Sequence, residues 1–238
     1  NRYYEYNKID ELSKNVDMIF LCNPNNPTLD TLNREKLLNI IRKNQNCHFV
    51  IDETELVFNA DYSERTLINE TINNINLSVI TSVSKFFGVP GLRCGFIITN
   101  EVNAKKINKI RILFSINIFS ELFMINYFNR FNDIKLINKI QKNFKYLISN
   151  LNSKYITEII NENTGFILIK FEDSIDVNDL TEYLRTNGII IRNIKKSYPN
   201  FLGECIRVSA GKRNEFSKLI KYINLYMKNK IERKNINV

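Results

Sequence analysis

A lysine with hydroxyl groups on one side and an arginine on the other stands between two short apolar segments. Residues 82–96 read Ser-Val-Ser-Lys-Phe-Phe-Gly-Val-Pro-Gly-Leu-Arg-Cys-Gly-Phe, and the lysine is Lys85. The β-branched residues 76–81 before this stretch and residues 96–99 at its end predict two buried strands. Desolvation and a nearby cation both lower the pKa of a lysine, so we expect Lys85 to act as a nucleophilic amine.

The groups around Lys85 could also hold an anion. Ser82 and Ser84 precede it, and Arg93 follows eight residues later. Two hydroxyls and a guanidinium can bind a phosphate dianion, the guanidinium through two parallel hydrogen bonds. A lysine beside a phosphate-binding group is what pyridoxal phosphate requires, because a Schiff base and the phosphate together hold that cofactor.

The whole string, Ser-x-Ser-Lys-x-x-Gly-x-x-Gly-Leu-Arg-x-Gly, resembles the cofactor-lysine motif of class I and II pyridoxal-phosphate aminotransferases of fold type I. It is especially similar to the branch that holds histidinol-phosphate aminotransferase and threonine-phosphate decarboxylase. The resemblance implies that Lys85 forms the Schiff base with pyridoxal 5'-phosphate. It also implies an α/β fold: a partial three-layer α/β/α large domain with a mainly parallel sheet, and a smaller α+β C-terminal domain. An exposed loop lysine explains a lone Ser-Lys pair better than it explains the full string.

A turn with two prolines follows the first predicted strand. Residues 17–22 are a continuous apolar run, which predicts a buried parallel strand, and residues 23–28, Asn-Pro-Asn-Asn-Pro-Thr, end it. Ligands of open α/β sheets bind at such strand ends. The turn resembles the family motif whose asparagine bonds the phenolic oxygen of the cofactor, a role that falls to Asn26. The family continues with glycine where this chain has Leu29, so we expect an altered turn. An ordinary proline-stabilised loop is the alternative.

A carboxylate ends the next predicted strand, residues 47–51. Asp52 at this place needs a cationic or donor partner, since an unpaired buried carboxylate is costly. A protonated pyridine nitrogen would be such a partner, and the resemblance gives Asp52 that role. Three residues on, the family has tyrosine or phenylalanine where this chain has Glu55, so we expect the usual aromatic contact to be lost. A carboxylate at a helix N-terminus is the alternative.

Two arginines are candidates for substrate binding. Arg207 lies inside the apolar strand-like residues 205–209, where an arginine must find an anion. Ile-Arg-Val-Ser resembles the family segment whose arginine binds the substrate α-carboxylate. Gly-Ile-Ile-Ile-Arg-Asn, which contains Arg192, resembles a segment implicated in binding the distal phosphate of the substrate. A surface ion pair is an equal alternative for Arg192.

Composition excludes several classes of protein. Of the 238 residues 44% are hydrophobic and 25% charged, which indicates a globular chain. The net charge of +9 comes from lysines scattered along the chain, so we expect no nucleic-acid partner. No apolar run is long enough for a membrane span, and no signal peptide is evident. Four cysteines without metal-binding spacing and a single histidine predict reduced thiols, a cytoplasmic protein and no metal.

The pattern of elements predicts two domains joined by a helix. We expect a partial cofactor-binding large domain over residues 1–120, a connecting helix over residues 121–150 and a small domain over residues 151–238. Residues 114–131 are apolar with helical spacing, which predicts a core or dimer face. In the small domain we expect strands at 166–171, 189–191 and 205–209 and helices at 177–186 and 214–230.

The resemblance extends over nearly the whole chain but matches only the latter two-thirds of a typical member. We therefore expect a fragment that lacks the N-terminal third, which in the family supplies further phosphate ligands. The function expected is an aminotransferase that takes a small amino donor and an oxo-acid acceptor, as a homodimer. A decarboxylase similar to the threonine-phosphate enzyme is one alternative. A non-catalytic remnant of the fold is the other.

Overall fold

The computed structural model describes residues 3–151, 154–198 and 202–236, and for residues 230–236 the backbone alone. The chain divides into two compact units. The N-terminal unit is Tyr3–Ile134, and the C-terminal unit begins at Lys135. Each unit has its own hydrophobic core and is described by itself. The domain boundary that the sequence predicts near residue 150 remains a prediction.

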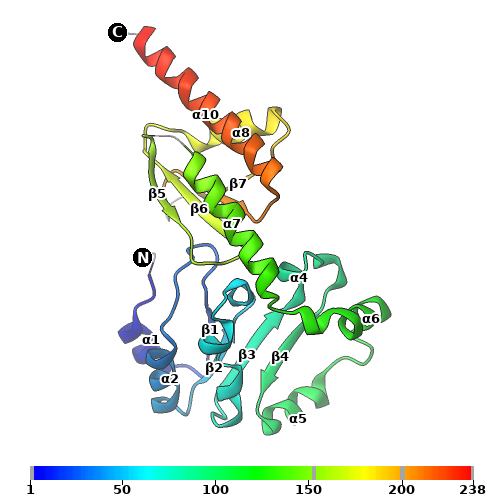
Figure 1. Cartoon of the computed structure of the whole chain (residues 1–238). Helices are drawn as coiled ribbons and strands as arrows, with labels where there is room; N and C mark the ends of the chain where they lie inside the picture. Colours follow the sequence, from blue (N-terminus) through cyan, green and yellow to red (C-terminus); the bar gives the residue numbers. More distant parts are fainter. Residues whose placement is uncertain (1–2, 152–153, 199–201, 237–238) are drawn as a thin grey trace. The chain divides into compact units, whose positions relative to one another are not determined.

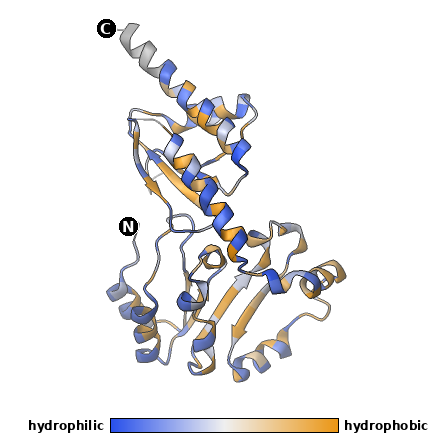
Figure 2. Cartoon of the chain, viewed as in Figure 1, coloured by the Kyte–Doolittle hydropathy of each residue, from blue (hydrophilic) through white to orange (hydrophobic). Residues whose placement is uncertain are grey.

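The N-terminal unit is built on a four-stranded sheet of order β1-β2-β3-β4 (Figure 1). Its strands are β1 (Met18–Cys22), β2 (His48–Asp52), β3 (Leu77–Ser82) and β4 (Gly95–Thr99). The first three strands are parallel and β4 runs antiparallel to β3. The apolar runs of the sequence predicted these strands to within a residue, and Figure 2 shows how strongly hydrophobic the strands are.

Amphipathic helices cover this sheet. α2 (Arg34–Lys43) buries Leu37, Leu38 and Ile41 in the core of the unit, and Asn33 caps it by accepting a hydrogen bond from the amide of Lys36. The other helices of the unit are α1 (Tyr6–Ser13), α3 (Tyr62–Arg65), α4 (Val83–Phe86), α5 (Glu101–Ile110) and α6 (Ile118–Tyr127). Short 3₁₀ turns occur at Leu56–Phe58, Ile68–Ile72, Pro90–Leu92 and Phe128–Arg130.

A chain of side-chain hydrogen bonds crosses three strands of the sheet. Nε2 of His48 on β2 lies 2.8 Å from the hydroxyl of Ser78 on β3. That hydroxyl donates to Thr99 on β4 at 2.9 Å, and Thr99 donates to the carbonyl of Leu77 at 3.1 Å. Because Ser78 already gives its proton to Thr99, His48 must donate to Ser78, so the imidazole carries its proton on Nε2.

The C-terminal unit is an α+β fold with an antiparallel sheet of order β5-β6-β8-β7. Its strands are β5 (Ile156–Ile160), β6 (Phe166–Phe171), β7 (Arg192–Asn193) and β8 (Cys205–Ser209). Its helices are α7 (Ile134–Asn150), α8 (Val177–Thr186), α9 (Ile194–Ser197) and α10 (Arg213–Ile236). Buried side chains from β6, β8, α8 and α10 form its core.

The predicted strand at residues 189–191 is wrong. Gly188 has φ +72° and its amide bonds the carbonyl of Arg185, while the amide of Ile189 bonds Leu184. These bonds close the C-terminus of α8, as Asn187-Gly188 predicted. The backbone therefore completes a helix cap, Ile190 is left 91% exposed, and strand pairing starts only at Arg192.

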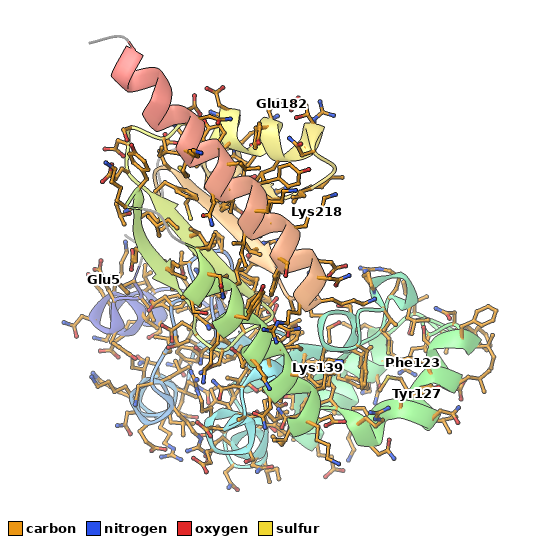
Figure 3. The ribbon with its side chains drawn as sticks, turned by 45° about the horizontal axis from the view of Figure 1, so that its top comes forward. Glu5, Phe123, Tyr127, Lys139, Glu182 and Lys218 are labelled. Atoms are coloured by element: carbon orange, nitrogen blue, oxygen red, sulfur yellow. The ribbon has the colours of Figure 1, made fainter. Side chains whose placement is uncertain are left out.

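The apolar residues 114–131 do not form a core. α6 runs through them, and Figure 3 shows Phe123 and Tyr127 on this helix, with ring centroids 4.9 Å apart. Phe114 is 98% exposed and Phe119 73% exposed. Of the two interpretations of residues 114–131, a core or a dimer face, the dimer face remains. No helix within the described ranges combines the length and apolarity needed to cross a membrane.

Candidate active site

Lys85 lies on the one-turn helix α4, three residues beyond the end of β3, and its side chain is exposed. The desolvation expected from the sequence is therefore not supplied by the residues that the structure describes. Val83 and Phe86 on the same helix are buried, and Phe86 packs against Phe58 with ring centroids 5.5 Å apart. The helix is thus anchored by its neighbours, and Lys85 points away from that anchor.

Ser82 and Ser84 are in direct contact. The hydroxyl of Ser82 caps α4 by accepting a hydrogen bond from the amide of Ser84 at 3.2 Å, and it donates to the carbonyl of Cys94 at 3.0 Å. The two hydroxyl oxygens are 2.8 Å apart. Because the proton of Ser82 goes to Cys94, the hydroxyl of Ser84 donates to Ser82 here, and it would have to rotate away from Ser82 to donate to an added anion.

Arg93 follows Ser84 by nine residues and precedes β4. Gly95 pairs with Ser82 in the antiparallel register, so Arg93 emerges at the edge of the sheet where β3 ends. It adopts a left-handed backbone conformation with φ +53°, and its exposed guanidinium donates to the carbonyl of Pro90 at 3.1 Å. Ser82, Ser84 and Arg93 thus lie on connected backbone at one edge of the sheet.

Asp52 ends β2 at the same edge. It is the register partner of Cys22 on β1 and of Ile80 on β3. The carboxylate is half-buried and accepts a hydrogen bond from the amide of Thr54 at 2.9 Å. Burial, and then the charge of Asp52, raise the pKa of the Cys22 thiol. Carboxylate and thiol therefore face the same side of the sheet.

The turn after β1 carries Asn26, whose side chain is exposed. Within the turn the amide of Leu29 bonds the carbonyl of Asn25 at 2.8 Å, and the amide of Asn25 bonds the carbonyl of Asp30 at 2.8 Å. Leu29 has φ +63° and is only 1% exposed. The backbone conformation that glycine adopts most easily is therefore occupied by leucine, whose side chain is held in the interior.

Two buried carboxylic acids follow Asp52. Glu53 is fully buried, and its carboxylate accepts hydrogen bonds from the hydroxyl of Thr66 at 2.5 Å and the amide of Leu67 at 2.8 Å. Burial raises the pKa of Glu53 to about 7, and the nearby Asp52 adds to that effect. Glu55 is also buried. Glu53 was not among the residues predicted from the sequence. The available signal was an acid that directly follows the aspartate at the end of a strand and therefore projects to the opposite face.

The two candidate substrate arginines face each other in the C-terminal unit. Arg192 on β7 and Arg207 on β8 are direct partners in the antiparallel register, so their side chains project from the same face. The guanidinium of Arg207 lies 4.9 Å from the ring centroid of Phe166. A cavity of about 220 Å³ is lined by both arginines together with residues such as Ile191, Ser209, Glu215 and Phe216. Guanidinium groups bind carboxylates and phosphates through paired hydrogen bonds, so two of them lining one cavity can hold an anion.

Six of the eight sequence-predicted residues thus belong to one edge of the N-terminal sheet, and two share a cavity of the C-terminal unit. An amine, a carboxylate, an amide, two hydroxyls and a guanidinium at the carboxyl ends of parallel strands form a donor set that fits pyridoxal phosphate. The role of each residue stays a prediction.

The family model of aminotransferase class I and II matches residues 4–223. This chain belongs to that family. It is 34% identical to histidinol-phosphate aminotransferase of Buchnera aphidicola subspecies Cinara cedri over 95% of its own length and 63% of that protein. It is 32% identical to the enzyme of the same name from Flavobacterium psychrophilum, of which it covers 60%. The chain therefore spans about three-fifths of these curated relatives.

Solved structures agree with this assignment. The histidinol-phosphate aminotransferase of Clostridium acetobutylicum superposes with a TM-score of 0.85 and 26% identity, over 94% of this chain and 68% of that one. The fold is shared with L-threonine-O-3-phosphate decarboxylase of Porphyromonas gingivalis, at a TM-score of 0.76 and 24% identity, over 90% of this chain and 65% of that one. The chain therefore has the fold of the type I pyridoxal-phosphate-dependent aminotransferases.

Proposed function

We propose that this chain is a pyridoxal-phosphate-dependent aminotransferase similar to histidinol-phosphate aminotransferase, with Lys85 holding the cofactor. One observation carries the proposal: the Asn26 turn, Asp52 and the helix of Lys85 follow the aligned carboxyl ends of three parallel strands. The 34% identity to the Buchnera enzyme supports the same reading.

We expect these side chains to bind different parts of the cofactor. Asp52 would accept a hydrogen bond from the protonated pyridine nitrogen, and Asn26 would donate to the phenolic oxygen. Ser84 and Arg93 would bind the phosphate, while Ser82 keeps α4 in place through its bonds to Ser84 and Cys94. Bound in this way, the cofactor supplies an electron sink for the α-carbon of the substrate. The amine of Lys85 would then take up and return the α-proton.

The facing arginines indicate an anionic substrate. Arg207 would bind the α-carboxylate of the amino donor, and Arg192 the phosphate of a phosphorylated amino compound. Two guanidinium groups on one face of β7 and β8 can bind a ligand that carries negative charge through charge-assisted hydrogen bonds. An oxo acid would be the acceptor, bound by the same residues.

The test is to add pyridoxal 5'-phosphate to the full chain and record its visible spectrum. We expect an absorbance band at about 420 nm, the region where this cofactor absorbs when bound to a lysine. Lys85→Ala should abolish the band, whereas Lys109→Ala, which removes a lysine from α5, should leave it unchanged. Product analysis with histidinol phosphate and with threonine phosphate would then distinguish transamination from decarboxylation.

A second candidate is a non-catalytic protein that keeps the fold. The exposed side chain of Lys85 and the buried Glu55, where the family has an aromatic residue, favour it. A wild-type chain that yields no band, and whose spectrum matches that of Lys85→Ala, would support this candidate and contradict the first.

We further infer a homodimer that works in the cytoplasm. The exposed apolar side chains of α6 and of the segment before it support the dimer, since monomers rarely leave so large an apolar patch in water. The four cysteines, none of which forms a disulfide, support a reducing compartment.

A further inference from the structure

Tyr4 crosses the turn that carries Asn26 and bonds to both of its ends. Its backbone amide donates to the carboxylate of Asp30, at the far end of the turn. Its hydroxyl donates to the carbonyl of Cys22 at 2.8 Å, where β1 ends and the turn begins. One residue outside the turn therefore ties together two points that are eight positions apart in the chain.

The hydroxyl of Tyr4 also reaches the middle of the turn. It lies 3.2 Å from Oδ1 of Asn25, the residue directly before Asn26. The same side-chain amide donates to the hydroxyl of Thr28 at 2.7 Å, and that hydroxyl accepts from the amide of Asp30 at 3.1 Å. These bonds form a continuous network among the residues that precede and follow Asn26 and Pro27 in the turn.

The phenol of Tyr4 is in an environment that keeps it protonated, so it remains a hydrogen-bond donor. Its ring packs against the core of the N-terminal unit and is half-buried. Burial raises the pKa of the phenol to about 12; the charges of Cys22 and Asp30 add to this effect, and the hydrogen bond to the Cys22 carbonyl partly opposes it. The phenol therefore stays protonated at every pH at which the protein would work, so the bond to Cys22 does not titrate.

We propose that Tyr4 is a positioning residue that fixes the turn and thereby presents Asn26 to the cofactor. The role of Asn26 in this inference rests on the proposed function. That Tyr4 stabilises the turn rests only on its hydrogen bonds to the turn. This role requires no contact between Tyr4 and the cofactor or the substrate. Its effect passes through Asn25, which shares a peptide bond with Asn26.

The test compares Tyr4→Phe with Tyr6→Phe in the full chain. Tyr6 is a matched control, because it lies two residues on, and its hydroxyl accepts a hydrogen bond from the amide of Asn33 at the start of α2, not from the turn. Each variant loses one tyrosine hydroxyl and keeps the ring that packs on the core. Hydrogen exchange of the backbone amides is measured first, without cofactor.

In Tyr4→Phe we expect the amides of Asn25 and Leu29 to exchange about tenfold faster, the effect of losing one hydrogen bond of ordinary strength. The amides of the sheet should exchange as in the wild type. In Tyr6→Phe the turn should be unchanged and the first turn of α2 should exchange faster. Equal exchange of the turn in Tyr4→Phe and in the wild type would overturn the proposal.

The second readout is the pH titration of the bound cofactor's absorbance. A hydrogen bond from Asn26 stabilises the phenolate form, so a loosened turn should raise the pKa of that transition by about half a unit or more, while Tyr6→Phe leaves it unchanged. An unshifted titration in Tyr4→Phe would overturn the link to Asn26. If the wild type binds no cofactor, the proposed function fails, and the exchange measurement still decides whether Tyr4 holds the turn.

Discussion

At the scale of single residues, Leu29 combines an unfavourable backbone with a favourable side chain. The left-handed conformation costs a residue with a Cβ roughly 1 kcal/mol, while burying a leucine side chain contributes about 2 kcal/mol. The family's glycine would avoid the first effect and forgo the second. We interpret the substitution as one that preserves the path of the turn, because the burial outweighs the strain.

This balance predicts an inverted order of stability. Leu29→Ala loses the buried side chain beyond Cβ and keeps the strained backbone, whereas Leu29→Gly loses one more carbon and relieves the strain. We expect Leu29→Gly to be at least as stable as Leu29→Ala, with both about 2 kcal/mol or more less stable than the wild type. Urea denaturation measures the free energies of unfolding.

Leu32 provides the control for Leu29. It is buried to a similar degree but has no positive φ. There, the usual order should hold, with Leu32→Gly less stable than Leu32→Ala. The same order at both positions would contradict the explanation.

What the sequence could predict at this scale was residue type and order along the chain. The spacing of Asn26, Asp52 and Lys85 relative to three apolar runs was enough to bring them to one edge of a parallel sheet. The exposure of Lys85 could not be predicted, because exposure depends on which other parts of a protein cover a side chain. Tyr4 was missed for a related reason: its contacts join residues 18 to 26 positions apart.

At the scale of elements, Glu53 ties the end of β2 to the segment at Thr66 and Leu67. The pKa of Glu53 in the folded protein is about 7, above its ordinary value of 4.5, so folding favours the protonated acid. Its contribution to stability is fully present below pH 4.5 and is lost as the pH rises to 7. The total change is about 3 kcal/mol.

Glu53→Gln removes this titration and keeps the shape of the side chain. We expect the variant to gain stability relative to the wild type as the pH rises from 4.5 to 8, by up to about 3 kcal/mol. Urea denaturation at a series of pH values would measure the difference. As a control, Glu64→Gln on the exposed surface of α3 should give a constant difference. If the difference in the free energy of unfolding between Glu53→Gln and the wild type did not change with pH, the raised pKa of Glu53 would be contradicted.

The strands of the parallel sheet were the easiest elements to predict, since each is a short apolar run bounded by turn residues. β5 was missed because Ile-Thr-Glu-Ile-Ile mixes polar and apolar residues at an edge of its sheet. Residues 189–191 were predicted as a strand from their composition, but the cap of α8 determines their backbone. Local hydrogen bonds at a helix end therefore prevailed over β propensity.

At the scale of the whole molecule, the exposed apolar surface of α6 and the preceding segment predicts self-association. Phe119→Glu places a charge on this surface without disturbing a buried side chain. We expect the wild type to sediment as a dimer. The dissociation constant of the dimer should be about tenfold higher or more in the variant, whereas the free energy of unfolding of the separated chains should be unchanged.

Ile72→Glu is the control for the dimer, since Ile72 is 75% exposed on a different element of the same unit. It should sediment like the wild type. A wild-type chain that stays monomeric at every concentration, or equal dissociation of both variants, would argue against a dimer through α6.

The proton order from His48 through Ser78 to Thr99 has a practical consequence. The chain contains one histidine, so its imidazole gives a single set of magnetic resonance signals. That ring is bonded into a relay that exists only while β2, β3 and β4 keep their alignment. Its chemical shifts therefore serve as an internal gauge of the sheet, readable in the intact protein without any attached label.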